Sequence, residues 1–217
     1  MATNSNQMAY NEGEIKTCLS NISAGYTDLV TAIGTSMQNK VIHAFGQVWY
    51  ATNAKSYWDE EVTSWNSMCG QIRSRFVVIN DMINTCASNY ATAAGTTWSK
   101  QQFNGDTAKV TNEVTDKRGD GYVGIVDIGT FKTIKDTTIN TIKDDADTAL
   151  NKVLSACDAS GFIDSSTEET IRSIINTIKT NITTAINTAK EDIAKNSGTA
   201  ESNFESARSA NASSSAS

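Results

Sequence analysis

The sequence predicts an all-α protein, a long antiparallel helical hairpin followed by a second helical hairpin in an elongated bundle or coiled coil. Three observations predict this class. Apolar residues recur at steps of four and three over long stretches, which is the period of packed helices. The 217 residues contain no proline, the residue that most strongly breaks a helix. Short polar segments separate consecutive apolar stripes, so neighbouring helices are expected to fold back on one another.

The longest apolar stripe lies in residues 58–90, and only Gly70 interrupts it as a weak helix former. Its positions are Trp58, Val62, Trp65, Cys69, Ile72, Phe76, Ile79, Ile83, Cys86 and Tyr90. One continuous helix of about 50 Å would carry all of them. Such a helix needs a partner of equal length to bury its stripe.

An upstream stripe supplies that partner. Its positions are Ile15, Leu19, Ile22, Tyr26, Leu29, Ile33, Met37, Val41 and Phe45. Only a short segment separates the two stripes, and a short connection forces the helices antiparallel. Residues 1–97 are therefore expected to form a long hairpin that turns at Trp49-Tyr50-Ala51.

The C-terminal half repeats this pattern after a mixed connector, residues 98–127, which is expected to hold one short helix at most. Residues 128–196 contain two more apolar stripes at three-four spacing, and a polar turn at residues 158–161 separates them. This pattern predicts the second helical hairpin. Residues 197–217 are rich in Ser, Ala and Asn, which predicts a mobile polar tail.

Composition excludes several classes of function. The net charge of −6 argues against nucleic acid as the main partner, because phosphate binding needs basic clusters. No apolar run reaches 18 residues, so no membrane span is expected. The first residues have neither the basic start nor the apolar core of a signal peptide. The protein is therefore expected to stay in the cytoplasm or to leave by a route that recognises a folded shape.

The cysteines and the single histidine give no catalytic or metal-binding pattern. The spacing of Cys18, Cys69, Cys86 and Cys157 matches no zinc or redox motif. Cysteines on a helix stripe commonly serve as small core residues, whereas the hairpin would also place Cys18 roughly opposite Cys86, as a disulfide requires. Both alternatives stay open. We find no nucleophile–base pair and no phosphate-binding glycine loop, so an enzyme is not expected.

Residues 8–95 resemble the Trp-x-Gly (ESAT-like) family of helical-hairpin proteins exported by type VII secretion systems. Trp49-Tyr50-Ala51 stands where the family has its Trp-x-Gly turn, and Ala54 and Tyr57 follow as a small residue and an aromatic. The chain departs from the family at Ala51, which replaces Gly. The family's export signal is a Tyr followed four residues later by an acid. Tyr90 lacks that acid, and Tyr57 with Glu61 has the spacing at the other end of the helix.

The resemblance implies a secreted, non-enzymatic interaction protein that reaches the cell surface or the exterior without a signal peptide. Helix packing would join it to a second copy or to another protein, as a homo- or hetero-oligomer. Four aromatics on the central stripe are the expected partner-binding residues, because one facing helix covers too little of them: Trp58, Trp65, Phe76 and Tyr90. The alternative is a structural subunit of a filament or of a phage or injection machine, in the cytoplasm or in an assembled particle.

A second motif lies in residues 116–127 and resembles the calcium loop of EF-hand and dockerin modules. Asp116, Asp120 and Asp127 occupy the first, fifth and twelfth positions, and Gly121 occupies the sixth. Arg118, at the third position, cannot bind a cation. The motif leaves two alternatives, a calcium-stabilised binding module with calcium as the cofactor and a polar turn without metal.

Overall fold

A computed structural model describes residues 10–50, 54–113 and 125–214 of the chain. The all-α class predicted from the sequence is confirmed, since long helices make up most of the described chain. The elements in order are α1 (Glu12–Val30), η1 (Thr31–Ile42), α2 (His43–Val48), β1 (Trp49–Tyr50), α3 (Ala54–Ala93), β2 (Ile125–Val126), α4 (Ile128–Thr133), η3 (Ile134–Thr138), α5 (Ile139–Asp158) and α6 (Ser165–Ser214).

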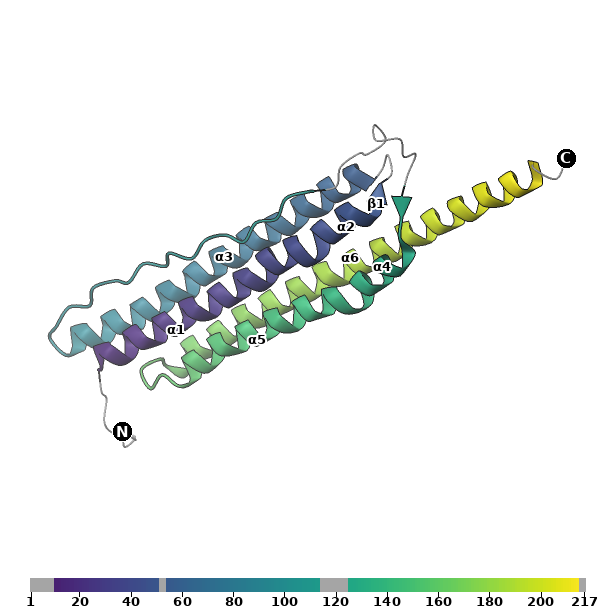
Figure 1. Cartoon of the computed structure of the whole chain (residues 1–217). Coiled ribbons are helices and arrows are strands. Elements are labelled where there is room, and N and C mark those ends of the chain that lie inside the picture. Colours follow the sequence, from purple (N-terminus) through teal and green to yellow (C-terminus); the bar gives the residue numbers. More distant parts are fainter. Residues whose placement is uncertain (1–9, 51–53, 114–124, 215–217) are drawn as a thin grey trace.

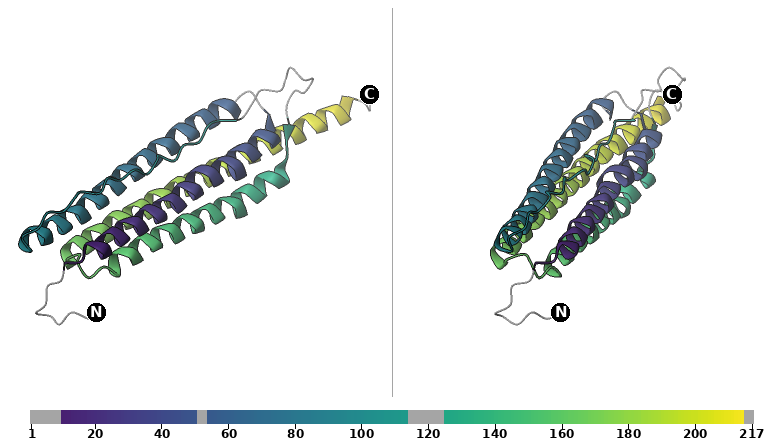
Figure 2. Two further views of the ribbon diagram at one scale, coloured as in Figure 1. Left: turned by 60° about the vertical axis from the view of Figure 1, so that its left-hand side comes forward. Right: turned by 90° about the vertical axis from the view of Figure 1, so that its left-hand side faces the viewer.

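These elements form four long helical rods that lie side by side (Figures 1 and 2). The run from α1 to α2 is one rod, and it forms an antiparallel hairpin with α3. The run from α4 to α5 is another, and it forms an antiparallel hairpin with α6. The two hairpins lie side by side and share one hydrophobic core, to which all four rods contribute.

The predicted stripes supply most of that core. Every position of the upstream stripe is at most 7 % exposed. Eight of the ten positions in residues 58–90 are also buried, whereas Val62 and Tyr90 are half-buried. In the second hairpin, Ile139, Ile142, Ile171 and Ile175 are each at most 1 % exposed. Periodicity therefore predicted correctly which face of each helix turns inward.

The first rod packs closely against α5 as well as against α3. A methyl group on Gly25 of α1 would lie 2.7 Å from Cγ2 of Val153 and 3.2 Å from the carbonyl oxygen of Ala149. Only a residue without a side chain lets the two helices approach this closely. The spacing predicted a single partner helix for the upstream stripe, and the structure adds α5 as a second one.

The C-terminal tail differs from its prediction. Residues 197–214 continue α6 as helix instead of forming an irregular polar tail. In Figure 1 this part of α6 projects beyond the other rods. No proline interrupts it, and its alanines favour a helix, so nothing local ends the helix where the core ends.

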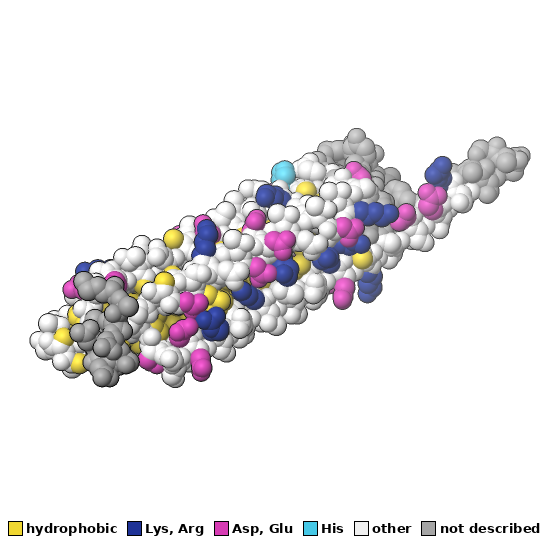
Figure 3. Space-filling view, turned by 90° about the horizontal axis from the view of Figure 1, so that it is seen from below, with side chains coloured by type: hydrophobic (Ala, Val, Ile, Leu, Met, Phe, Trp, Pro, Cys, Tyr) yellow, Lys and Arg dark blue, Asp and Glu magenta, His cyan; other side chains and the backbone are white. Residues whose placement is uncertain are grey.

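The surface is polar and mixed in charge. Acidic and basic side chains are interspersed along the face shown in Figure 3. Pairs such as Lys152 with Asp28, and Arg172 with Asp158, connect neighbouring segments at 2.5 and 2.8 Å. Among the described residues, no helix has both the length and the apolar character that crossing a membrane requires.

Candidate functional site

The described part of the connector, residues 98–113, lies in extended form along α3 and returns toward the bend of the first hairpin (Figures 1 and 2). No helix occurs in this described part. Polar side chains at steps of seven along α3 hold it: Asp59, Asn66, Arg73 and Asn80. Steps of seven place side chains on one helix face, so α3 presents a polar stripe beside its apolar one.

Three amide side chains bind the connector in the same way. Each donates to the carbonyl and accepts from the N–H of one connector residue, as a neighbouring strand would. Asn84 pairs with Gln101 at 3.0 and 2.8 Å, Asn66 with Val110 at 2.8 and 2.9 Å, and Gln38 with Thr111 at 3.2 and 2.7 Å. These bonds satisfy backbone groups that have no helix or sheet partner.

Apolar contacts fix the middle of the connector. Phe103 is 8 % exposed, and its ring lies 4.9 Å from that of Tyr26 and 6.1 Å from that of Phe76. The Tyr26 hydroxyl donates to the carbonyl of Asp106 at 2.7 Å. Burial raises the pKa of Tyr26 to about 12. The connector is therefore part of the core, and the sequence signal for it was the seven-residue spacing of polar residues on α3.

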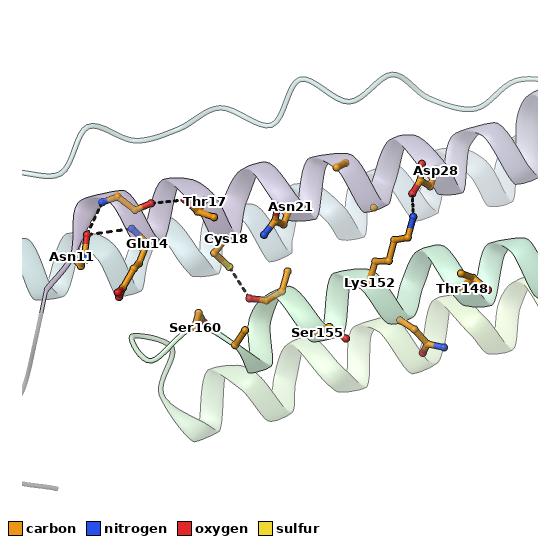
Figure 4. Close-up of a pocket in the computed structure, with 16 residues that line it drawn as sticks. Asn11, Glu14, Thr17, Cys18, Asn21, Asp28, Thr148, Lys152, Ser155 and Ser160 are labelled. Atoms are coloured by element: carbon orange, nitrogen blue, oxygen red, sulfur yellow. Dashed lines mark hydrogen bonds and ion pairs between the residues drawn. The ribbon is translucent and has the colours of Figure 1, made fainter. Parts of the chain in front are cut away.

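A groove of about 970 Å³ lies between α1 and α5, at the end of the bundle where α1 begins (Figure 4). Small and polar side chains line it, among them Thr17, Asn21, Ser155 and Ser160. The N-terminus of α1 borders the groove, where Asn11 accepts from the N–H groups of Gly13 and Glu14 at 3.0 and 3.3 Å. The Lys152–Asp28 ion pair crosses it.

Cys18 lies in the wall of this groove and contacts α5. Its Sγ donates to the carbonyl of Ala156 at 3.4 Å, and the neighbouring side chain of Cys157 is the largest cause of the lowered pKa of Cys18. The disulfide considered between Cys18 and Cys86 is absent, because Cys86 lies near Asp164 and Thr167, 3.7 Å from an oxygen of each. All four cysteines are buried and unbridged, as core packing predicts. The pairing of Cys18 with Cys157 was missed because it depends on how the two hairpins pack.

The expected partner-binding aromatics lie largely inside the chain. Trp58, Trp65 and Phe76 are 1 %, 5 % and 0 % exposed, so their availability to a partner was wrongly predicted. The prediction assumed one facing helix, whereas the second hairpin and the connector also cover this stripe. Phe45 and Phe131 form a cluster around Trp58, with ring centroids 4.7 Å apart for Phe45–Trp58 and 5.1 Å for Phe45–Phe131. Tyr90 is half-buried against the core.

The bend of the first hairpin is partly described. Trp49 and Tyr50 are extended and pair antiparallel with Val126 and Ile125. This short ladder joins the bend to the segment that enters the second hairpin. Ala51, the position of the family's glycine, lies outside the described residues.

The calcium-loop motif falls mainly outside the described residues. Asp116 and Asp120 lie in the undescribed segment, and Asp127 is described. Asp127 caps α4, and its carboxylate accepts from the N–H of Thr130 at 3.1 Å and from the Thr130 hydroxyl at 2.9 Å. These hydrogen bonds lower the pKa of Asp127. Calcium binding at residues 116–127 stays a prediction.

The Tyr57–Glu61 pair, which has the spacing of the family's export signal, faces α6. Both side chains are half-buried. Burial raises the pKa of Glu61, and the charges of Asp192 and Glu60 raise it further. The pair therefore lies partly in the interface between the two hairpins.

No protein-family model, curated protein or solved structure matches the chain.

His43 and several described acidic residues form hydrogen bonds, ion pairs or helix caps. His43 Nδ1 lies 2.7 Å from Glu113 Oε2 at the surface, where it ties the connector to α2. Among the described residues, no group of three or more His, Cys, Asp or Glu side chains is arranged to hold a metal ion. The chemistry that the described residues offer is thiol chemistry at Cys18 and hydrogen bonding to extended backbone along α3.

Proposed function

We propose that this chain is a non-enzymatic interaction protein that acts by helix–helix association. The projecting end of α6, residues 196–214, is the helix that it presents. One observation carries the proposal: α6 continues beyond the rods that bury its first part (Figure 1), and its described side chains between residues 198 and 210 are exposed.

The low stability of a single helix in water is the reason that the exposed end of α6 indicates a partner. A single helix of this length is marginally stable in water, because its stability depends on burying one face against a neighbour. In α6, Ile186, Ala189 and Ile193 are buried. The sequence continues their spacing with Ala200, Phe204 and Ala207. A second helix placed along this face would extend the packing of the bundle and stabilise the projecting end.

A second copy of the chain or a related helical protein is the partner that fits this face. Size-exclusion chromatography with light scattering tests it. We expect a mass above the 23.3 kDa of one chain that rises with concentration or on addition of the partner. Phe204→Ser should lower this association, whereas Asn203→Ala, at the neighbouring exposed position, should leave it unchanged. A full chain that stays at the monomer mass, alone and with candidate helical partners, would contradict the proposal.

A filament subunit is the second candidate function, and the position of the projecting helix favours it. The helix leaves one end of the bundle, and the groove between α1 and α5 lies at the other end (Figures 1 and 4). Contact between unlike surfaces of identical chains produces rings or open filaments. Electron microscopy of the concentrated protein separates this candidate from a closed dimer.

We also propose that the protein is exported without a signal peptide, by a type VII-like route, to the cell surface or the exterior. The support is the resemblance of residues 8–95 to the Trp-x-Gly family, together with the antiparallel arrangement of the first rod and α3 around Trp49 and Tyr50. Fractionation of a host with an active or an inactivated type VII ATPase tests this. Equal amounts of protein outside both strains would contradict it.

A further inference from the structure

Two thiols meet where the first hairpin packs on the second. Cys18 belongs to α1 and Cys157 to α5, and the two residues are 4 % and 1 % exposed. Cys18 Sγ lies 3.4 Å from the carbonyl of Ala156, the neighbour of Cys157, and the two thiols are close enough to shift each other's pKa. The close approach of α1 and α5 at Gly25 continues toward this pair, because the helices run antiparallel and both cysteines follow on the facing sides.

The two thiols are chemically unequal. Hydrogen bonds from Cys157 and Ser160 lower the pKa of Cys18, although burial opposes them. The interaction with Cys18, together with burial, raises the pKa of Cys157. Thiolate character determines which sulfur attacks a disulfide first. Cys18 is therefore the nucleophile of the pair, and Cys157 keeps its proton until a second step.

The groove gives Cys18 a route to small molecules. Cys18, Ala156 and Ser160 line the groove, and Figure 4 shows Cys18 pointing from α1 toward the end of α5, where a dashed line joins its sulfur to a carbonyl oxygen. The other two cysteines differ. Burial raises the pKa of Cys69 to about 12, and burial is also the largest cause of the raised pKa of Cys86.

We infer that Cys18 and Cys157 are a redox site, which a small-molecule disulfide oxidises to an intramolecular disulfide between α1 and α5. The Cys18 thiolate attacks one sulfur of the oxidant, forms a mixed disulfide and releases one thiolate. That thiolate takes the proton of Cys157. The Cys157 sulfur then attacks the Cys18 sulfur and releases the second half of the oxidant as a thiolate, which takes up the proton that Cys18 lost to water on ionising. The two cysteines lose two electrons, and the small disulfide gains them as two thiols.

This bond would lock the two hairpins together. It closes a long loop of the chain, which is the case in which a disulfide restricts the unfolded state most. We expect oxidation to raise the melting temperature of the full chain by about 10 °C. The site is remote from the projecting end of α6, so its loss should leave the association of that helix unchanged.

The test treats the full chain with oxidised glutathione, blocks the remaining thiols and maps the cysteines by mass spectrometry. We expect one Cys18–Cys157 cross-linked peptide pair, free thiols at Cys69 and Cys86, and a melting temperature that returns to its starting value with dithiothreitol. Cys18→Ser and Cys157→Ser should each abolish the cross-link and the shift. Cys69→Ser and Cys86→Ser are the matched controls and should keep both.

Three results would overturn the inference. They are four free thiols after oxidation, a cross-link between Cys18 and Cys86, and a glutathione adduct on Cys18 that Cys157 never resolves. A chain carrying serine at both Cys69 and Cys86 keeps the test decisive if a single substitution at Cys18 or Cys157 prevents folding. Its two remaining cysteines either form the bond or stay reduced.

Discussion

The indole N–H of Trp65 in α3 donates to the backbone carbonyl of Ile33 in η1, with 2.8 Å between Nε1 and the oxygen. This buried bond crosses the first hairpin and ends in the segment Thr31–Ile42, where the helix has π-type hydrogen bonding. Side chains that bond to helix carbonyls commonly accompany such local changes in helix geometry. Trp65 therefore joins the apolar stripe of α3 to the backbone of the first rod.

Trp65→Phe should destabilise the protein more than Trp58→Phe does. Both residues are buried in α3, and both substitutions remove a similar volume. Trp65 loses its bond to Ile33, whereas the indole N–H of Trp58 has no acceptor among the described residues. We expect a difference of about 1–3 kcal/mol in the free energy of unfolding, measured by urea denaturation. Equal effects of the two substitutions would contradict the role given to the Trp65–Ile33 bond.

Asn84→Ala should release the connector. The side-chain oxygen of Asn84 accepts from Trp98 Nε1 and from the N–H of Gln101, each at 2.8 Å, so the substitution leaves both donors without that acceptor. We expect a loss of about 2–4 kcal/mol in unfolding free energy. Faster amide hydrogen exchange should appear near residue 101. Asn89→Ala, at an exposed position of the same helix, is the control and should change stability by less than about 0.5 kcal/mol.

Gly25→Ala and Gly70→Ala should have opposite effects. Alanine favours a helix over glycine by about 1 kcal/mol, and both residues lie within helices. A Cβ at Gly70 meets nothing within 4 Å, so this substitution should be stabilising. At Gly25 the methyl would push α1 away from Val153 and Ala149, which should cost about 1–3 kcal/mol. Thermal unfolding of both variants checks this, and a stabilised Gly25→Ala variant would show that α1 and α5 are less closely packed.

Acid should weaken the cap of α6. Asp164 accepts from the N–H of Thr167 at 3.0 Å and from its hydroxyl at 2.7 Å, and these bonds lower the pKa of Asp164. When the pKa of a carboxyl is lower in the folded chain than in the unfolded chain, its ionised form stabilises the fold. This stabilisation is fully present above the ordinary Asp pKa of about 3.9 and is lost as the pH falls through the pKa of the folded chain. The urea midpoint of Asp164→Asn should therefore lie below that of the natural chain at pH 7, and the two midpoints should converge in acid. Asp127→Asn repeats the test at α4, and a gap that persists in acid would contradict it.

Local periodicity predicted the helices well, but one irregularity in the spacing was not recognised as a structural signal. Leu29, Ile33, Met37, Val41 and Phe45 follow one another in steps of four. In a regular α-helix, each step of four rotates a side chain about 40° past a full turn, so four such steps would carry the stripe off one face. The structure keeps all five residues buried because the helix widens between Thr31 and Ile42. The consecutive steps of four in the sequence therefore correspond to the widened helix in the structure.

The candidate sites could be predicted less well from the sequence than the helices. Trp58, Trp65 and Phe76 were identified as large apolar anchors, but their spacing gives no information on how many helices cover them. Asn66, Arg73 and Asn80 lie at steps of seven. Such a polar stripe is equally typical of a helix face exposed to solvent and of one that binds another segment. Only the tertiary structure shows that these side chains hold residues 98–113 of the connector.

The sequence alone determined that the chain is helical and which face of each long helix turns inward. It also placed the ends of the long helices within a few residues, except the C-terminal end of α6. These properties depend on interactions between residues a few positions apart, which the spacing of side chains records directly. The tertiary structure decided that the hairpins lie side by side, that the connector enters the core, and that Cys18 meets Cys157 and not Cys86. Those outcomes depend on contacts between residues far apart in the chain. The free energy gained by burying all four stripes in one core determines these contacts. No single stripe specifies which helices become its neighbours.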